Sequence, residues 1–209
     1  MSGFSRTGML RVALTGGIAT GKSYVLARFQ RLGVACLDSD VLAHGVMVAG
    51  TEATEQIAAR FGADILADDR SVNRAKLGPI VFADPAARKD LEAIVHPAVY
   101  RAIAAGVRAF EALGGYAVAV VDVPLLFETD HAYEFDSVVV TACSEEQQMA
   151  RMLERGLSHA EARQRLAAQM PTVEKVRKAD YVIKTDGTFE ETDAQVEAVL
   201  SDLVTSTRR

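Results

Sequence analysis

The chain has 209 residues, of which 49% are hydrophobic and 24% charged, and it carries a formal net charge of −5. This length fits one domain, or one core with insertions, and the composition is that of a globular protein able to bury a sizeable core. The acidic balance argues against a general nucleic-acid surface, which needs a basic face, so an anionic substrate would require local clusters of Arg and Lys.

The termini and the cysteines predict a cytoplasmic protein. The first residues, MSGFSRTG, lack the apolar middle of a signal peptide, and residues 1–8 are interpreted as a flexible lead. The sequence has no run of about 18 apolar residues, so no membrane-spanning segment is expected. Cys36 and Cys143 lie in apolar, strand-like runs, which predicts buried, reduced thiols.

Five short apolar runs predict the strands of a parallel sheet. They are continuous rather than alternating, which is typical of strands buried on both faces. Helical patterns separate them, so the sequence predicts an α/β fold built from βαβ units. The runs are Leu10–Leu14, Val34–Leu37, Ala117–Val121, Ser137–Thr141 and Tyr181–Ile183.

A glycine-rich stretch, LTGGIATGKSY, joins the first predicted strand to a helical pattern. It contains Gly16-x-x-x-x-Gly21-Lys22-Ser23, the P-loop pattern, in the strand-to-helix context that this pattern requires. Backbone N–H groups of such a loop and the helix N-terminus hold phosphates, whereas a glycine-rich turn without a ligand is the plain alternative. Lys22 would reach the β- and γ-phosphates, and Ser23 would bind Mg²⁺.

The P-loop predicts ATP and Mg²⁺ as the cofactors of this chain. GTPases read guanine with Asn-Lys-x-Asp, but the single asparagine, Asn73, is followed by Arg74. A D-x-x-G switch is absent from the sequence as well, so a small ATP-dependent phosphotransferase is the preferred interpretation. The predicted nucleotide-binding residues of the loop are Gly17, Ile18, Ala19, Thr20, Gly21, Lys22, Ser23 and Tyr24.

Two aspartates mark the end of the second predicted strand, in the stretch ACLDSD. In a doubly wound sheet the carboxyl ends of the strands face the ligand crevice. Asp38 is therefore a candidate to accept a hydroxyl proton or to support the metal ion. Asp40 begins the next helical run, where it is either an N-cap or a second functional carboxylate.

The interval after the second strand, about residues 39–115, carries no strand pattern and predicts a helical insertion. Proline suits the first turn of a helix, so Asp84-Pro85 and His96-Pro97 are interpreted as helix starts. His96 is either a structural residue at such a start or a group that touches substrate, and the residues alone leave both roles open.

The third predicted strand runs into Asp122, in the stretch AVAVVDVPLLFE. An apolar strand that closes in aspartate resembles a Walker B strand, whose carboxylate supports Mg²⁺. Ser23 and Asp122 are therefore the predicted metal-binding residues. Pro124 stops the strand, and Glu128 is interpreted as a solvated residue at a helix start.

The interval of residues 144–177 is helical, charged and rich in arginine. Capping boxes are predicted at Ser144–Gln147 and Ser158–Glu161. Arg151 and Arg155 lie four residues apart, on one helix face, where they could close over transferring phosphates. A lid is preferred over a solvated charged helix. The remaining basic residues of this group are Arg163, Arg165, Lys175 and Arg177.

Eight motifs together resemble the dephospho-CoA kinase family, in its order and spacing, from about Leu10 to Leu203. The motifs are LTGGIATGKS, LDSDVLAH, FGADIL, NRAKLGPIVF, HPAV, VDVPLLFE, RMLERGLS and KADYVI. The resemblance implies ATP-dependent phosphorylation of the ribose 3′-hydroxyl of dephospho-CoA, the last step of coenzyme A synthesis. Dephospho-CoA is then the small-molecule partner, with neither nucleic acid nor membrane expected and the oligomeric state left open.

The same resemblance implies a division of the chain into functional parts. The nucleotide-binding core is assigned residues 9–38, 114–143 and 178–209. Residues 39–113 would form a helical insertion that binds CoA, and residues 144–177 would form a mobile lid.

Site residues follow from the positions that match the family motifs. Asp38 falls on the aspartate taken as the catalytic base, beside Lys22 and Arg151 as the other catalytic residues. Arg155 is the second lid arginine and is assigned to the nucleotide. The residues implied to bind substrate are Asp38, Arg74, His96 and Gln169.

Some positions depart from the family pattern. Ala19-Thr20 replaces the usual Gly-Ser inside the loop, and an alanine there is expected to require a negative φ. Tyr24 replaces the usual threonine, and Ala49 replaces a proline. Thr185 stands where the family has asparagine, in a loop implied to lie near adenine. The P-loop lysine and serine and the strand-end aspartate are retained, so an active enzyme is expected.

Two other functions stay open on the residues alone. A nucleotide or nucleoside kinase of the same P-loop group would release ADP with AMP or a nucleoside, but not with dephospho-CoA. A non-catalytic, ATP-binding regulator would show no acceptor-dependent turnover, and Asp38 would be dispensable.

Overall fold

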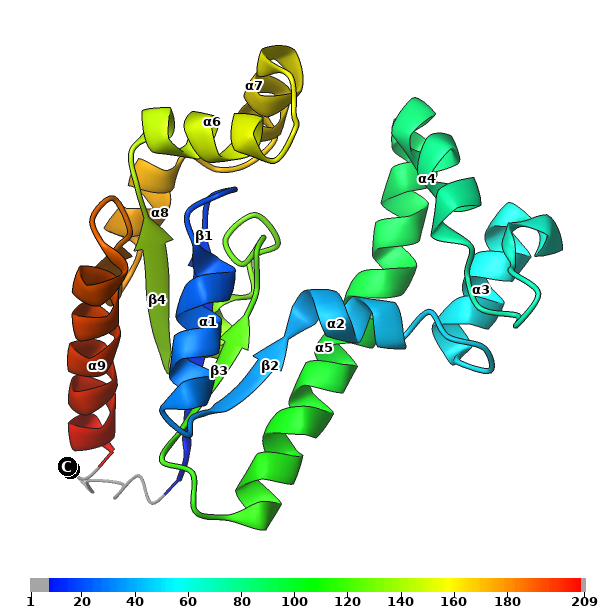
Figure 1. Ribbon diagram of the computed structural model, residues 1–209. Coiled ribbons are helices and arrows are strands. Elements are labelled where there is room, and N and C mark those ends of the chain that lie inside the picture. The colour runs from blue at the N-terminus through cyan, green and yellow to red at the C-terminus, as the bar shows by residue number, and fades with distance from the viewer. Residues whose placement is uncertain (1–7, 208–209) are drawn as a thin grey trace. The chain divides into compact units, whose positions relative to one another are not determined.

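The computed structural model describes residues 8–207, and its first unit is built on a five-stranded sheet (Figure 1). β1 pairs in parallel with β3 and β4, and β4 pairs in parallel with β5, in the order β2-β3-β1-β4-β5. The five predicted strands are therefore confirmed, with ends that differ by one or two residues. They are β1 (Leu10–Gly16), β2 (Ala35–Asp38), β3 (Val118–Asp122), β4 (Ser137–Ala142) and β5 (Tyr181–Lys184). Of the predicted lead over residues 1–8, all but Gly8 lies outside the described residues.

The core of the sheet explains why its strands are continuous apolar runs. Every residue of β3 is buried, as are all residues of β1 except Arg11, because helices cover the sheet. Two helices, α1 (Lys22–Arg31) and α9 (Phe189–Ser206), pack against each other (Figure 1). Their buried residues, with those of the strands, form one cluster: Leu10, Val12, Leu14, Val25, Leu26, Phe29, Val118, Val120, Val139, Ile183, Val196, Val199 and Leu203.

The chain separates into two compact units. The first contains the sheet and comprises the residues up to Leu37 and those from Ala109 onward. The second, Asp38–Arg108, is helical and has its own apolar cluster of Met47, Ile57, Ile65, Val72 and Leu77. Its elements are α2 (Ser39–Gly45), α3 (Glu52–Phe61), η1 (Ala63–Ile65), α4 (Arg74–Ala83) and most of α5 (Pro85–Leu113).

One predicted helix start is confirmed and the other is wrong. α5 begins at Pro85, where the side chain of Asp84 accepts a hydrogen bond from the backbone N–H of Ala86 at 2.8 Å. No helix starts at His96-Pro97, because α5 runs through Pro97. Apolar residues just beyond this proline, including Ala98 and Val99, are buried, and this packing holds the helix together where proline supplies no N–H.

After β4 the chain forms three helices: α6 (Glu145–Glu154), α7 (His159–Ala167) and α8 (Thr172–Arg177). Figure 1 shows α6 and α7 beyond the end of β4. The capping box of Ser158 and Glu161 is confirmed. Ser144 caps α6 by accepting from the N–H of Gln147, but its own N–H donates to Asp186 instead of Gln147, because the loop after β5 lies beside it. Among residues 8–207, every helix is too short or too polar to cross a membrane.

Candidate active site

The P-loop turns from β1 into α1 through backbone that admits little but glycine. Gly21 precedes the first turn of α1 with φ +84°, in the left-handed region that favours glycine. A Cβ on Gly16 would lie 2.2 Å from Oγ1 of Thr141, which is far inside van der Waals contact. The loop is therefore closely packed at Gly16, and two of its N–H groups already donate within the protein, that of Ile18 to Gln169 and that of Thr20 to the Gly17 carbonyl.

Ala19 also has a positive φ, of +58°, so the expectation that an alanine here needs a negative φ is wrong. The left-handed conformation costs an L-residue roughly 1–2 kcal/mol. Burial offsets this cost, because the Ala19 side chain packs into a small apolar cluster with Met152 and Ala162. Its carbonyl also accepts a hydrogen bond of 3.0 Å from Nη1 of Arg151.

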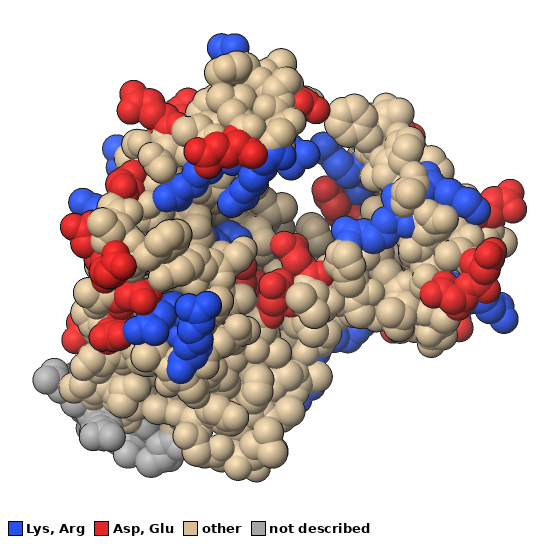
Figure 2. Space-filling model, in the orientation of Figure 1, with Lys and Arg blue, Asp and Glu red and all other residues tan. Residues whose placement is uncertain are grey.

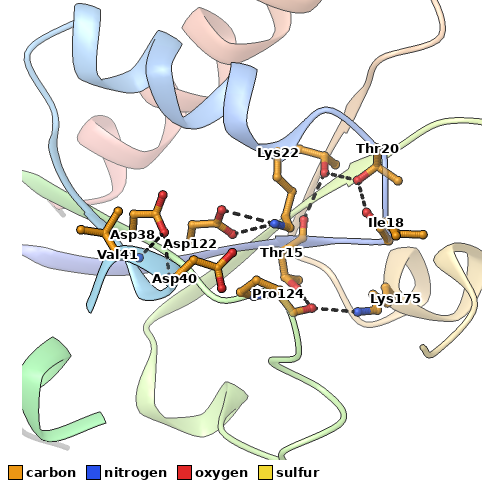
Figure 3. A network of polar contacts seen from close by, with 12 residues as sticks. Thr15, Ile18, Thr20, Lys22, Asp38, Asp40, Val41, Asp122, Pro124 and Lys175 are labelled. Carbon is orange, nitrogen blue, oxygen red and sulfur yellow. Dashed lines mark hydrogen bonds and ion pairs between the residues drawn. The ribbon is translucent and has the colours of Figure 1, made fainter. Parts of the chain in front are cut away.

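Lys22 and Asp122 form an ion pair at the mouth of the loop. Nζ of Lys22 lies 3.1 Å from Oδ1 of Asp122 and donates to Oδ2 at 3.3 Å (Figure 3). Asp122 is only 5% exposed, and Lys22 is partly buried. Because β3 lies beside β1 in the sheet, its last residue reaches the P-loop lysine, so the structure brings a predicted catalytic residue and a predicted metal-binding residue together.

The next two residues of α1, Ser23 and Tyr24, have different surroundings. Ser23 is exposed in the first turn, which leaves its hydroxyl free to meet a ligand from solvent. Tyr24 instead donates from its hydroxyl to Asp193 at 2.8 Å, and its ring lies 4.7 Å from that of Phe189. The hydrogen bond to Asp193 raises the pKa of Tyr24 above its ordinary value.

Asp38, and not Asp40, caps the start of α2. Oδ1 of Asp38 accepts hydrogen bonds from the N–H groups of Asp40 (2.8 Å) and Val41 (3.2 Å), so Asp38 is the N-cap. Of the two roles left open for Asp40, the N-cap is wrong, because α2 already begins at Ser39, directly after β2. Asp40 is exposed in the first turn, where its negative charge interacts favourably with the positive end of the helix dipole.

Arg151 is tied to the back of the P-loop and to the loop after β5. Besides the Ala19 carbonyl, its guanidinium contacts the carbonyl and hydroxyl oxygens of Thr185. Thr185 is buried, and its hydroxyl donates to the carbonyl of Thr20 at 2.9 Å. Arg155 is the exposed C-cap of α6. The two predicted lid arginines therefore have different settings, one bonded to backbone and the other open to solvent.

Gln169 reaches the P-loop from the segment between α7 and α8. Its Oε1 accepts the N–H of Ile18 at 2.9 Å, while Nε2 of Gln148 donates to the Ile18 carbonyl at 2.6 Å. A cavity of about 700 Å³ opens beside these contacts and is lined in part by Gly17 and Arg163. The structure thus places Gln169 against the loop where phosphates are expected.

Two other predicted residues, Arg74 and His96, lie together in the helical unit. They line a cavity of about 320 Å³ whose walls include Met47, Leu77 and Val95. Arg74 also contacts His44, a residue that sequence reasoning did not single out although it closes the motif LDSDVLAH. A cation beside an imidazole and an apolar wall is suited to an anionic group attached to an apolar chain.

Two charged residues, Lys175 and Glu128, form an ion pair that the sequence does not predict. The sequence places Lys175 among the basic residues of the lid that could reach phosphates, yet its side chain is completely buried. Glu128 is exposed, as expected, but no helix starts there, and its Oε1 lies 2.8 Å from Nζ of Lys175. Burial lowers the pKa of Lys175, an effect that the bond to Glu128 opposes. No pattern in a charged helix distinguishes such a lysine from its solvated neighbours.

Figure 2 shows Lys and Arg side chains alternating with Asp and Glu over the upper part of the view, whereas the lower part is mostly uncharged. Within residues 8–207, no three His, Cys, Asp or Glu side chains are grouped so that they could hold a metal ion by themselves. A divalent cation at this site would therefore take ligands from the nucleotide and water in addition to protein oxygens.

Known proteins match the chain along most of its length. The dephospho-CoA kinase family model matches residues 10–191. Dephospho-CoA kinase of Geobacter metallireducens is 46% identical over 198 residues, which cover 94% of this chain and 98% of that protein.

Two solved structures are also similar to this chain over most of its length. A crystal structure from Thermus thermophilus superposes with a TM-score of 0.78 at 30% identity, covering 94% of this chain and 99% of that one. Dephospho-CoA kinase from Campylobacter jejuni gives a TM-score of 0.70 at 26% identity, covering 94% and 98%. The chain has a P-loop directly after β1, and the lysine of this loop pairs with the last residue of β3. Together with the match to the family model and to the Geobacter metallireducens relative, these features show that the chain belongs to the dephospho-CoA kinase family.

Proposed function

We propose that this chain transfers the γ-phosphoryl group of ATP to the ribose 3′-hydroxyl of dephospho-CoA, which yields coenzyme A and ADP. Family membership over nearly the whole chain supports the substrate and the place in coenzyme A biosynthesis. The observation that carries the chemistry is the Lys22–Asp122 pair at the mouth of an intact P-loop. It puts a cation and a carboxylate where triphosphate and its metal ion are handled in P-loop enzymes.

The phosphates of ATP fit the loop that residues 16–23 form. Its tight packing at Gly16 supports the view that the N–H groups not bonded within the protein face a ligand, and α1 adds the partial positive charge of a helix N-terminus. Lys22 would exchange part of its interaction with Asp122 for the β- and γ-phosphates. The contacts of Gln169 with Ile18 support a role for that glutamine at the same place.

Mg²⁺ fits the two oxygen groups that the structure offers, the exposed hydroxyl of Ser23 and the carboxylate of Asp122. Mg²⁺ prefers oxygen ligands and commonly takes one or two protein groups plus phosphates and water, which suits so small a protein set. When bound, it would neutralise charge on the β- and γ-phosphates. Asp122 would hold the metal ion beside these phosphates, and Lys22 would stay close to the same carboxylate.

Asp38 is proposed as the base that accepts the proton of the 3′-hydroxyl. It ends β2, and its capping bonds to α2 hold the carboxylate in one orientation. Arg151 is proposed to hold the P-loop and the 185–188 loop together during phosphoryl transfer. Arg155, which is exposed to solvent, is proposed to neutralise the negative charge of the phosphates. Positive charge beside a transferring phosphoryl group stabilises its transition state.

The remaining parts are assigned by the same reasoning. Residues 39–113 would bind the CoA portion through Arg74 and His96, and residues 144–177 would act as the lid over the nucleotide core. The protein is proposed to work in the cytoplasm on a small molecule, without nucleic acid or a membrane as partner.

Acceptor-dependent ADP release tests this function. The purified protein is given ATP and Mg²⁺ with dephospho-CoA, AMP or a panel of nucleosides, and release without an acceptor is subtracted. Turnover with dephospho-CoA alone is expected, with coenzyme A identified by mass. Turnover only with AMP or a nucleoside would favour a nucleotide kinase, and ATP binding without any turnover would favour a regulator.

A further inference from the structure

A completely buried lysine, Lys175 of α8, lies behind the candidate active site. Its Nζ is 2.8 Å from Oε1 of Glu128 and donates to the carbonyl of Pro124 at 3.1 Å. Removing an ammonium group from water is costly, and buried ion pairs are often replaced by apolar residues without loss of stability. Stability alone therefore gives little reason for a lysine in this place.

The carbonyl that Lys175 binds belongs to the turn after Asp122. Pro124 is two residues beyond that aspartate, and its carbonyl also accepts from the hydroxyl of Thr15 at 3.3 Å (Figure 3). Thr15 is itself fully buried and directly precedes Gly16 of the P-loop. A single carbonyl oxygen thus joins β1, the turn after β3, and α8.

Glu128 connects the same turn to the start of α8. Its Oε1 accepts the backbone N–H of Met170 at 2.9 Å, in addition to its contact with Lys175. The preceding residue, Gln169, holds the N–H of Ile18 in the P-loop. The turn of residues 123–128 is therefore held at both ends by the segment 169–175, which also contacts the phosphate loop.

We propose that Lys175 is a positioning residue, whose ammonium group fixes the turn of residues 123–128 and so sets Asp122 against Lys22 and the bound metal ion. The inference rests on the proposed function. Lys175 does not touch the reacting groups; it acts through Pro124 and Glu128. Misplacing a catalytic group by about 1 Å costs up to about 10²-fold in rate, so the orientation of Asp122 has a large effect on turnover.

The test compares Lys175→Met with the double variant Lys175→Met/Glu128→Gln. Methionine fills a similar volume but does not donate to Pro124. In the double variant no carboxylate is left without its cation, and glutamine still accepts from Met170. Lys89→Met serves as the control, because Lys89 is an exposed lysine of the helical unit. The measurements are kcat, the KM of each substrate, the Mg²⁺ concentration for half-maximal rate, and the urea midpoint.

We expect Lys175→Met to lower kcat about 10- to 100-fold and to raise the Mg²⁺ requirement, with the KM for dephospho-CoA nearly unchanged. The double variant should recover the urea midpoint but not kcat or the Mg²⁺ requirement. Recovery of kcat together with the midpoint would overturn the proposal, as would a kcat and Mg²⁺ requirement near those of wild type in Lys175→Met. If Lys175→Met does not fold, the double variant alone is measured. A low kcat with a raised Mg²⁺ requirement then supports the proposal, and values near those of wild type overturn it.

Failure of the positioning role of Lys175 can be distinguished from failure of the proposed kinase function. If wild-type protein shows no turnover with dephospho-CoA, the function fails, but Mg²⁺-dependent ATP binding remains measurable by calorimetry. Loss of the Mg²⁺ contribution to ATP binding in the double variant still supports the positioning role. An unchanged Mg²⁺ contribution contradicts it.

Discussion

Nζ of Lys22 lies 3.1 Å from Oδ1 of Asp122, so an ion pair joins the P-loop lysine to the last residue of β3. β1 and β3 are adjacent and parallel, with Leu14 in register with Asp122. The register therefore determines which carboxylate meets the lysine.

Replacing Lys22 with Met should lower kcat at least about 10²-fold, because the charge at the β- and γ-phosphates is lost. It should also destabilise the fold by about 1–3 kcal/mol, since the buried carboxylate of Asp122 loses its cation. ADP release and urea unfolding measure the two effects. In the matched variant Lys22→Met/Asp122→Asn, stability should largely return while activity stays low. Near-normal kcat in folded Lys22→Met would contradict the P-loop assignment.

Asp38→Asn should lower kcat by roughly 10²–10⁴, the usual contribution of general acid–base catalysis, with little change in ATP affinity. Asparagine caps helices as well as aspartate does, so the start of α2 should remain intact. Asp38→Ala removes the cap too and should lose about 1 kcal/mol of stability in addition. Comparing the two separates catalysis from capping. Full kcat in Asp38→Asn would exclude the base, and lost ATP binding would make Asp38 a metal or structural residue.

Residues 144–177 should gain hydrogen-exchange protection when a non-hydrolysable ATP analogue binds. Closure over ATP excludes water that would otherwise compete as the acceptor. The exposed Arg155 offers charge that the triphosphate attracts. The apolar core helix α9 is the internal reference. Unchanged protection throughout 144–177 would count against a lid.

Gly16→Ala should destabilise the protein by about 1–3 kcal/mol, as overpacked cores do, and should weaken ATP binding. The new methyl would press on the side chain and carbonyl of Thr141, which is fully buried. Gly45→Ala is the control, because a Cβ there meets nothing within 4 Å. Its stability change should stay within about 0.5 kcal/mol. Equal effects of the two substitutions in urea unfolding would refute the packing explanation.

Cys36 should make the protein less stable above pH 9. Burial raises the pKa of its thiol to about 12. The unfolded thiol ionises at lower pH, so the unfolded state binds fewer protons in this window and stability falls as pH rises. At pH 10 the full shift would amount to about 1.4 kcal/mol, and partial exposure reduces our expectation to about 0.7 kcal/mol.

Urea unfolding in reducing buffer at pH 7.5 and pH 10 measures this loss. Cys36→Ala should show a smaller decrease between the two pH values than wild type, since Cys143 and the other titrating groups are common to both proteins. An equal decrease in the two proteins would show that Cys36 does not cause it.

The sequence by itself determined the sheet, the P-loop and the family. Continuous apolar runs are unusual outside doubly buried strands, and Gly16, Gly21 and Lys22 occur at a spacing that serves one kind of loop. The strands and the P-loop are local properties, because each depends on residues within one turn or one strand, whereas the family follows from the order and spacing of motifs along the whole chain. The start of α5 at Pro85 and the capping box at Ser158 were predictable for the same reason.

Tertiary structure decided what depends on neighbours distant in the chain. α5 continues through Pro97 because buried side chains beyond it outweigh the missing hydrogen bond. Ala19 keeps a positive φ because its methyl group is buried. Lys175 is charged like the exposed Arg177 and Lys178 that follow it, and only the approach of Pro124 and Glu128, in the turn after β3, makes it a buried contact of that turn. The burial and the pairing of a side chain arise from packing between segments that are distant in the sequence, so no local sequence pattern predicts them.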